Sequence, residues 1–150
     1  MSVKVAVASD DGETVGWGHF AHNRYFLIYE VNKGSFRLLE KRFNPFSSVP
    51  DIDDPGAIHT DDDPDSGLAR LHGIEKYSTL RKMALSDVEL IIASGGCPTS
   101  IVYFTGEGVR FIFTEPSTDA SKVLEELANK PVDELPAIMT FEDGKLVLEF

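Results

Sequence analysis

Two histidines lie three residues apart in a glycine-rich segment near the amino terminus, Gly16 to His22, which reads GWGHFAH. Imidazole is a common ligand of zinc, iron and copper, and His19 and His22 can converge on one ion if the backbone makes a helical turn or a tight loop. An H-x-x-H pair alone is a weak signal. The alternative is that His19 hydrogen-bonds its own loop while His22 is a solvated surface residue.

A second segment with unusual chemistry is the sequence Ser94-Gly95-Gly96-Cys97-Pro98. Backbone N–H groups of a glycine turn at the start of a helix can point at an anion. The same field favours a thiolate at Cys97, which is the form of cysteine that ligates metals. The alternative is a glycine-rich turn that carries a buried, inert cysteine.

A third imidazole, His72, precedes Gly73 near the start of an expected helix and is predicted to lie at the same rim. Taken alone, a histidine in this position fits a structural role better than a ligand role. A long segment at 45–67 is rich in aspartate and lacks an apolar period, so it predicts a mobile loop. Its carboxylates can bind hard cations, but they lack the spacing of a calcium loop.

Composition limits the classes of protein to which the chain can belong. Its 150 residues, 42% hydrophobic and 26% charged, predict one domain over 1–150. The formal charge of −11 argues against nucleic acid as a partner, because phosphate backbones are bound by cationic side chains. We also expect no membrane partner, since no apolar run approaches the roughly 20 residues that cross a bilayer. One cysteine cannot form an internal disulfide, which favours a cytoplasmic protein.

The expected elements alternate between strands and helices along most of the chain. Apolar and β-branched runs predict strands at 4–8, 24–31, 35–43, 87–93 and 109–114. Helical spacing predicts helices at 68–85, 98–105 and 119–129. A carboxy-terminal addition at 131–150 contains Asp143-Gly144, a strong signal for a small hairpin.

This element order predicts an α/β fold around a mixed five-stranded sheet of order 3-2-1-4-5. The second and third strands are expected to be antiparallel, and the first, fourth and fifth to be parallel. Ligands of open α/β sheets bind at the carboxyl ends of the strands, where the strand order reverses. The segments that carry His19 and Cys97 follow the first and fourth strands, and therefore flank that crevice.

Several stretches resemble the dinitrogenase iron-molybdenum cofactor biosynthesis family. They are 3–10 (VKVAVASD), 18–31 (GHFAHNRYFLIYEV), Asn44-Pro45, His72-Gly73, 87–96 (DVELIIASGG) and 108–111 (GVRF), so the resemblance covers most of 3–130. It implies a three-layer fold similar to ribonuclease H and binding of iron-molybdenum cofactor or its iron-sulfur precursor. It also implies that His19 is the best ligand and His72 the next. Cys97, Thr99 and Ala21 depart from the residues usual in the family.

The favoured function is therefore a carrier of an iron-sulfur or iron-molybdenum type cluster, without catalysis and with a cluster-donor or acceptor protein as a further partner. The expected metal ligands are His19, His22, His72 and Cys97. Gly95 and Gly96 are expected to hydrogen-bond the cluster through their backbone amides. One alternative is a regulatory module that binds a small anion at the two glycines. Another is a metal-dependent phosphoryl-transfer enzyme that uses Asp10, against which the uncompensated negative charge argues.

Overall fold

A computed structural model of the protein describes residues 2–47, 73–131 and 134–147. His72 and most of the segment 45–67 lie outside these described residues. The strands are β1 (Val3–Ser9), β2 (Tyr25–Asn32), β3 (Ser35–Phe43), β4 (Leu90–Ala93), β5 (Arg110–Phe113), β6 (Ile138–Glu142) and β7 (Lys145–Val147). The helices are the 3-10 turn η1 (Phe20–His22), α1 (Gly73–Leu80), the π-helical turn η3 (Arg81–Leu85), α2 (Pro98–Gly106) and α3 (Ala120–Ala128).

The strands form one mixed sheet in the order β3-β2-β1-β4-β5-β6-β7. Strands β1, β4, β5 and β6 run parallel to their neighbours in that series, while β2, β3 and β7 are antiparallel to the strands beside them. The predicted order 3-2-1-4-5, the antiparallel second and third strands and the carboxy-terminal hairpin are confirmed. The likeness to ribonuclease H stays a prediction.

The predicted number of five strands was wrong, because the carboxy-terminal hairpin joins the sheet. After β5, α3 crosses one face of the sheet and returns the chain parallel to β5, so that Phe111 pairs with Ile138 and Phe113 with Thr140. The hairpin turn then has positive φ angles at both Asp143 and Gly144, as an Asp-Gly turn allows, and β7 pairs back on β6. Over the described part of the chain, the sheet therefore has seven strands.

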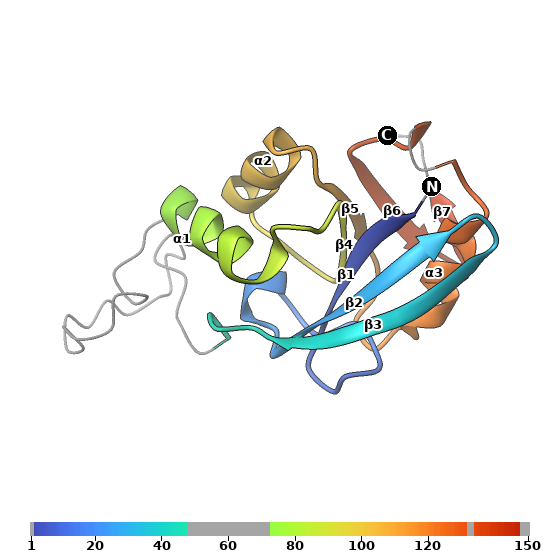
Figure 1. Ribbon diagram of the computed structural model, residues 1–150, viewed down its shortest axis with the longest axis horizontal. Helices are drawn as coiled ribbons and strands as arrows, with labels where there is room; N and C mark the ends of the chain where they lie inside the picture. Colours follow the sequence, from blue (N-terminus) through green and yellow to red (C-terminus); the bar gives the residue numbers. More distant parts are fainter. Residues whose placement is uncertain (1, 48–72, 132–133, 148–150) are drawn as a thin grey trace.

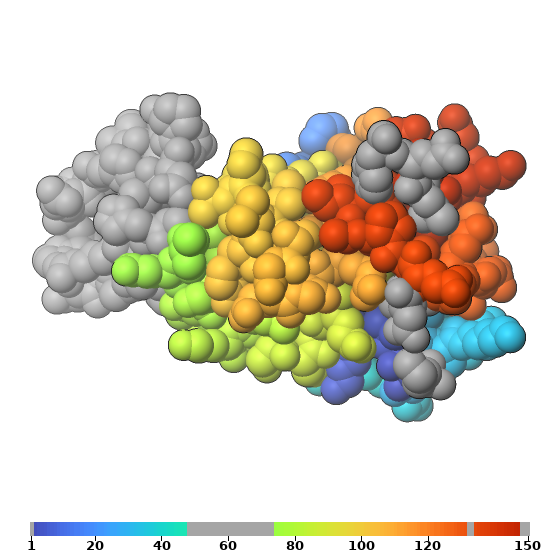
Figure 2. Space-filling model, turned by 90° about the horizontal axis from the view of Figure 1, so that it is seen from above, coloured from blue at the N-terminus to red at the C-terminus, as the bar shows by residue number. Residues whose placement is uncertain are grey.

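The sheet separates two helical layers, each with its own hydrophobic cluster. Alternate residues of β1 point to opposite faces: Val5 and Val7 pack towards α3, whereas Ala6 and Ala8 pack towards α1 and α2. Figure 1 shows α1 and α2 on one side of the strands and α3 on the other, and Figure 2 shows α1 (green) and α2 (gold) side by side. Because both faces are covered, β1 is apolar over nearly its whole length.

The observed helix ranges agree with the predicted ranges, except for the first predicted helix, 68–85. α2 and α3 match the predicted ranges within one residue, and Asp119 caps α3 by accepting a hydrogen bond from the Ser121 amide. The predicted helix at 68–85 is described from Gly73 onward, and its last turn is π-helical. Among the described helices, none is long and apolar enough to cross a lipid bilayer.

Candidate functional site

The loop that follows β1 is organised by two polar side chains, Asp10 and Asn23. The Asp10 carboxylate accepts hydrogen bonds from the Arg24 backbone amide at 3.0 Å and from the Asn23 side-chain amide at 3.3 Å. That amide also donates to the Trp17 carbonyl at 2.8 Å. A Cβ atom at Gly16 would lie 2.6 Å from the Asn23 Nδ2, so a residue other than glycine would force the Asn23 side chain to shift. Asp10, the carboxylate considered for phosphoryl transfer, therefore holds this loop together.

The turn η1 fixes both the backbone and the ring of His19. His19 is the residue that caps η1, and its Nδ1 accepts a hydrogen bond from the Ala21 amide at 3.1 Å. The buried Asn44 side chain donates to the carbonyls of Ala21 and Asn23, both at 2.8 Å. Phe20 and Ala21 are themselves buried in the core under α1 and α2. His19 is therefore presented from an anchored turn.

The two segments singled out in the sequence lie against each other. The Phe20 amide donates to the Gly95 carbonyl at 2.9 Å, and His19 and Gly95 form an isolated parallel bridge. A Cβ atom at Gly95 would lie 3.2 Å from the carbonyl carbon and oxygen of Gly18, which is tighter than ordinary van der Waals contact. Gly95 thus allows the close approach of the two backbones.

Cys97 is the residue that caps α2. Its Sγ accepts a hydrogen bond from the Ser100 amide at 3.4 Å, while the Cys97 amide donates to the Ser100 Oγ at 3.0 Å. The two residues form a reciprocal capping box, and Pro98 occupies the first turn, where it needs no amide partner. The thiol is half-buried and packs at the edge of the core beneath α2.

Tyr77, on α1, joins the imidazole to the thiol. Its hydroxyl oxygen lies 3.2 Å from the His19 Nε2 and 3.1 Å from the Cys97 Sγ. Its ring is fully buried and stacks on the His19 ring, with centroids 5.8 Å apart and planes within 6°. Ser100 Oγ also lies 3.4 Å from the His19 Nε2. Helical spacing indicates that Tyr77 faces the core, but spacing does not reveal where its hydroxyl points.

Two further predicted site residues, His22 and Gly96, lie beside the cluster of His19, Tyr77 and Cys97. The half-buried His22 ring lies 5.6 Å from the His19 ring, centroid to centroid and edge to face. Gly96 packs close to Phe20 and to Ser100. Within the ranges 2–47, 73–131 and 134–147, no three His, Cys, Asp or Glu side chains are grouped as a metal site. The structure thus brings together His19, Gly95 and Cys97.

Charged groups near these segments are held by local hydrogen bonds. In the loop after β1, the amide and hydroxyl of Thr14 and the amide of Glu13 donate to Asp11, and hold the pKa of its carboxyl well below the ordinary value. On α1, the fully buried Lys76 places its Nζ 5.9 Å from the centre of the Tyr77 ring. The amine of Lys76 therefore lies near the face of the tyrosine ring.

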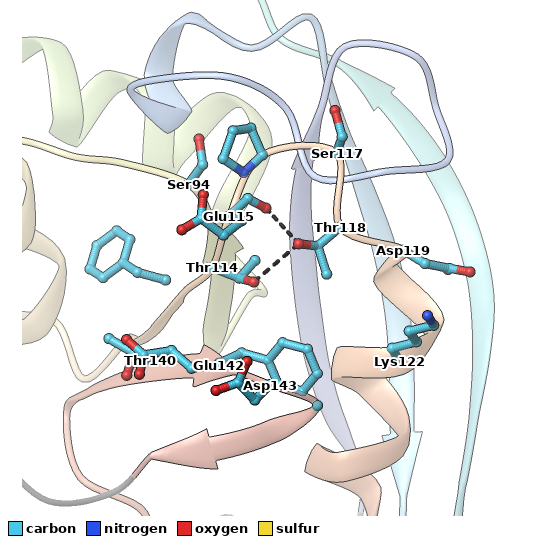
Figure 3. Close-up of a pocket in the computed structure, with 14 residues that line it drawn as sticks. Ser94, Thr114, Glu115, Ser117, Thr118, Asp119, Lys122, Thr140, Glu142 and Asp143 are labelled. Carbon is cyan, nitrogen blue, oxygen red and sulfur yellow. Dashed lines mark hydrogen bonds between the residues drawn. The ribbon is translucent and has the colours of Figure 1, made fainter.

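A separate cavity of about 850 Å³ opens at the carboxyl ends of β5 and β6, and Figure 3 shows its lining. Hydroxyl groups and carboxylates dominate its lining, and among the described lining residues only Lys122 is basic. Thr118 donates to the Glu115 carbonyl at 2.6 Å and lies 3.2 Å from the Thr114 hydroxyl. This cavity includes Ser94, the residue before the Gly95–Gly96 turn, but neither His19 nor Cys97.

Comparison with known proteins gives one match. The family model described as "Dinitrogenase iron-molybdenum cofactor" matches residues 1–130, a range that includes the strands from β1 to β5 and the helices η1, α1, η3, α2 and α3. A search of curated proteins found no match. The matched region contains both contacting turns and Tyr77, and ends before β6 and β7.

Proposed function

Because the chain belongs to the dinitrogenase iron-molybdenum cofactor family, we propose that it is a non-catalytic carrier of an iron-sulfur or iron-molybdenum type cluster. The cluster is the cargo, and the rim formed by the turns after β1 and β4 receives it. One observation carries this proposal: His19 and Cys97, 78 positions apart, share the hydroxyl of Tyr77 at 3.2 Å and 3.1 Å.

The chemistry of this rim suits such a cargo. Thiolate and imidazole are ligands of iron and of other soft or borderline metals, and amides can hydrogen-bond cluster sulfides. His19 and Cys97 are both half-buried, so a guest larger than one ion can reach them from outside. Stable protein-bound clusters usually have four cysteine ligands, whereas this chain contains one cysteine. Few ligands from the chain suit a protein that passes its cargo to a partner.

The alternatives draw less support from the same residues. An anion at the Gly95–Gly96 turn would use amides at the start of α2, but the Cys97 amide already donates to the Ser100 Oγ at 3.0 Å. A phosphoryl-transfer site would use Asp10, whose carboxylate already accepts hydrogen bonds from the Arg24 amide and the Asn23 side chain. Both observations favour the carrier.

Anaerobic reconstitution with ferrous iron and sulfide tests this proposal. We expect the wild-type protein to retain iron and sulfide after desalting and to show charge-transfer absorbance. The His19→Ala/Cys97→Ala double variant is expected to lose both, while a Val102→Ala control, at an exposed position on α2, retains them. Equal metal content in the wild type and the double variant would refute the proposal.

A further inference from the structure

The cavity shown in Figure 3 lies at an edge of the sheet where three parallel strands end. Ser94 directly follows β4, Thr114 directly follows β5, and Thr140 lies in β6. Ligands of open α/β sheets bind at the carboxyl ends of the strands, and small-molecule sites have volumes of about 300–1,000 Å³. With a volume of about 850 Å³, the cavity has the position and the size of a ligand site.

One wall of this cavity belongs to the part of the chain that the family model does not match. The match ends at residue 130, whereas residues 140–144 of the β6–β7 hairpin line the cavity. A ligand held here would therefore be additional to the function that family membership indicates.

Three hydroxyl groups of the lining have already used their hydrogens. Thr118 donates to the Glu115 carbonyl at 2.6 Å, so in its 3.2 Å contact with Thr114 the Thr114 hydroxyl must be the donor. The Ser94 hydroxyl donates to the Gly16 carbonyl at 2.7 Å. Each of the three oxygens keeps lone pairs but has no hydrogen left to offer a guest. These hydroxyls therefore favour a guest that donates hydrogen bonds.

The charged groups of the lining favour the same kind of guest. Glu115 lies on the turn after β5, whereas Glu142 and Asp143 lie at the β6–β7 turn, so the carboxylates stand on two separate walls (Figure 3). Among the residues that the structure describes, these three form no ion pair. Lys122 lies beside a fourth carboxylate, Asp119. The cavity therefore repels anions and attracts a guest with a positive charge at each end.

We propose that this cavity binds a small aliphatic amine with two or more ammonium groups. Ammonium groups supply the positive charge that both walls attract and the hydrogens that the hydroxyl oxygens can accept. Phe113 and Phe141 also line the cavity and offer apolar surface to the methylene groups of such a molecule. A bare metal ion suits the cavity less, because in the described part of the chain no three His, Cys, Asp or Glu side chains are grouped as a metal site. This inference does not depend on the carrier function.

Titration with diaminopentane, followed by the NMR shifts of backbone amides, tests the proposal. Salt at about 0.15 M screens weak attraction to the acidic chain as a whole. We expect saturable shifts at Thr114, Ser117 and Gly144, with a Kd of about 1 mM or tighter. The fully methylated, bis-quaternary analogue has the same charge but no N–H group, and should bind about tenfold more weakly. Equal binding of the two compounds, or no saturable shift at the cavity, would overturn the proposal.

Two double variants of equal charge locate the binding. Glu115→Gln/Glu142→Gln removes one carboxylate from each wall and should weaken binding by about fivefold or more. Glu75→Gln/Glu125→Gln is the matched control, because it removes the same charge at exposed positions of α1 and α3 outside the lining, and it should bind as the wild type does. Equal weakening in both double variants would contradict the proposal. Displacement of the amine by millimolar magnesium at the same ionic strength would also overturn it.

Discussion

Substitution of Gly16 by alanine should destabilise the protein through a steric conflict, chiefly with Asn23. The new Cβ would lie 2.6 Å from Asn23 Nδ2 and 2.8 Å from its Cγ, and the Asn23 side chain is 1% exposed and donates to the Trp17 carbonyl. Overpacking costs about 1–3 kcal/mol, and the reduced entropy of the unfolded chain returns about 0.4–1 kcal/mol. From the middle of the two ranges, we therefore expect the free energy of unfolding to fall by about 1.3 kcal/mol.

Urea unfolding of four variants tests this reasoning. Gly106→Ala is the matched control, because no atom lies within 4 Å of its new Cβ at the end of α2, and we expect it to be neutral or stabilising by up to about 1 kcal/mol. If Asn23 causes the conflict, Gly16→Ala should cost less in an Asn23→Ala background, by about 1 kcal/mol or more. An equal cost in both backgrounds would refute the explanation.

Three further results are expected. Arg42 hydrogen-bonds Asp87 at 2.8 Å and holds the pKa of that carboxyl well below its ordinary value, so the stability lost in Asp87→Asn should be largest above about pH 5 and shrink as the pH falls, measured by urea midpoints. Gly95→Ala should push the two turns apart and reduce the iron retained after reconstitution. Leu124 lies on the buried face of α3, and Leu124→Ala should lower the free energy of unfolding by about 2–5 kcal/mol but leave iron retention unchanged.

The order of the first five strands could be predicted because each strand has a distinct pattern and crossovers between parallel strands are right-handed. β4 is wholly apolar, as a strand covered on both faces must be, and Asn32, Lys33 and Gly34 signal the β2–β3 hairpin. The sixth strand was missed for a different reason. The Asp143-Gly144 signal placed residues 138–142 in a separate hairpin. Because a helix, α3, lies between β5 and these residues, they also complete a parallel crossover and pair with β5.

The candidate site was only partly visible in the sequence. His19, Gly95 and Cys97 follow the ends of adjacent parallel strands, so topology alone could predict that they meet. Tyr77 and Ser100 could not be found in this way. Tyr77 occupies a core position in its helix, and the direction of its hydroxyl depends on tertiary packing. Ser100 belongs to a capping box whose first member is cysteine, which is not among the residues usually preferred at that position.

The sheet places the residues of the candidate site on one of two separate hydrophobic clusters. Phe20, Ala21 and Tyr77 belong to the cluster beneath α1 and α2, whereas Leu124 and Leu127 of α3 belong to the other. Engineering can exploit this division. Substitutions in the α3 cluster can raise or lower thermal tolerance while the candidate site keeps its shape, so the α3 side is the place to begin when the protein is to be stabilised.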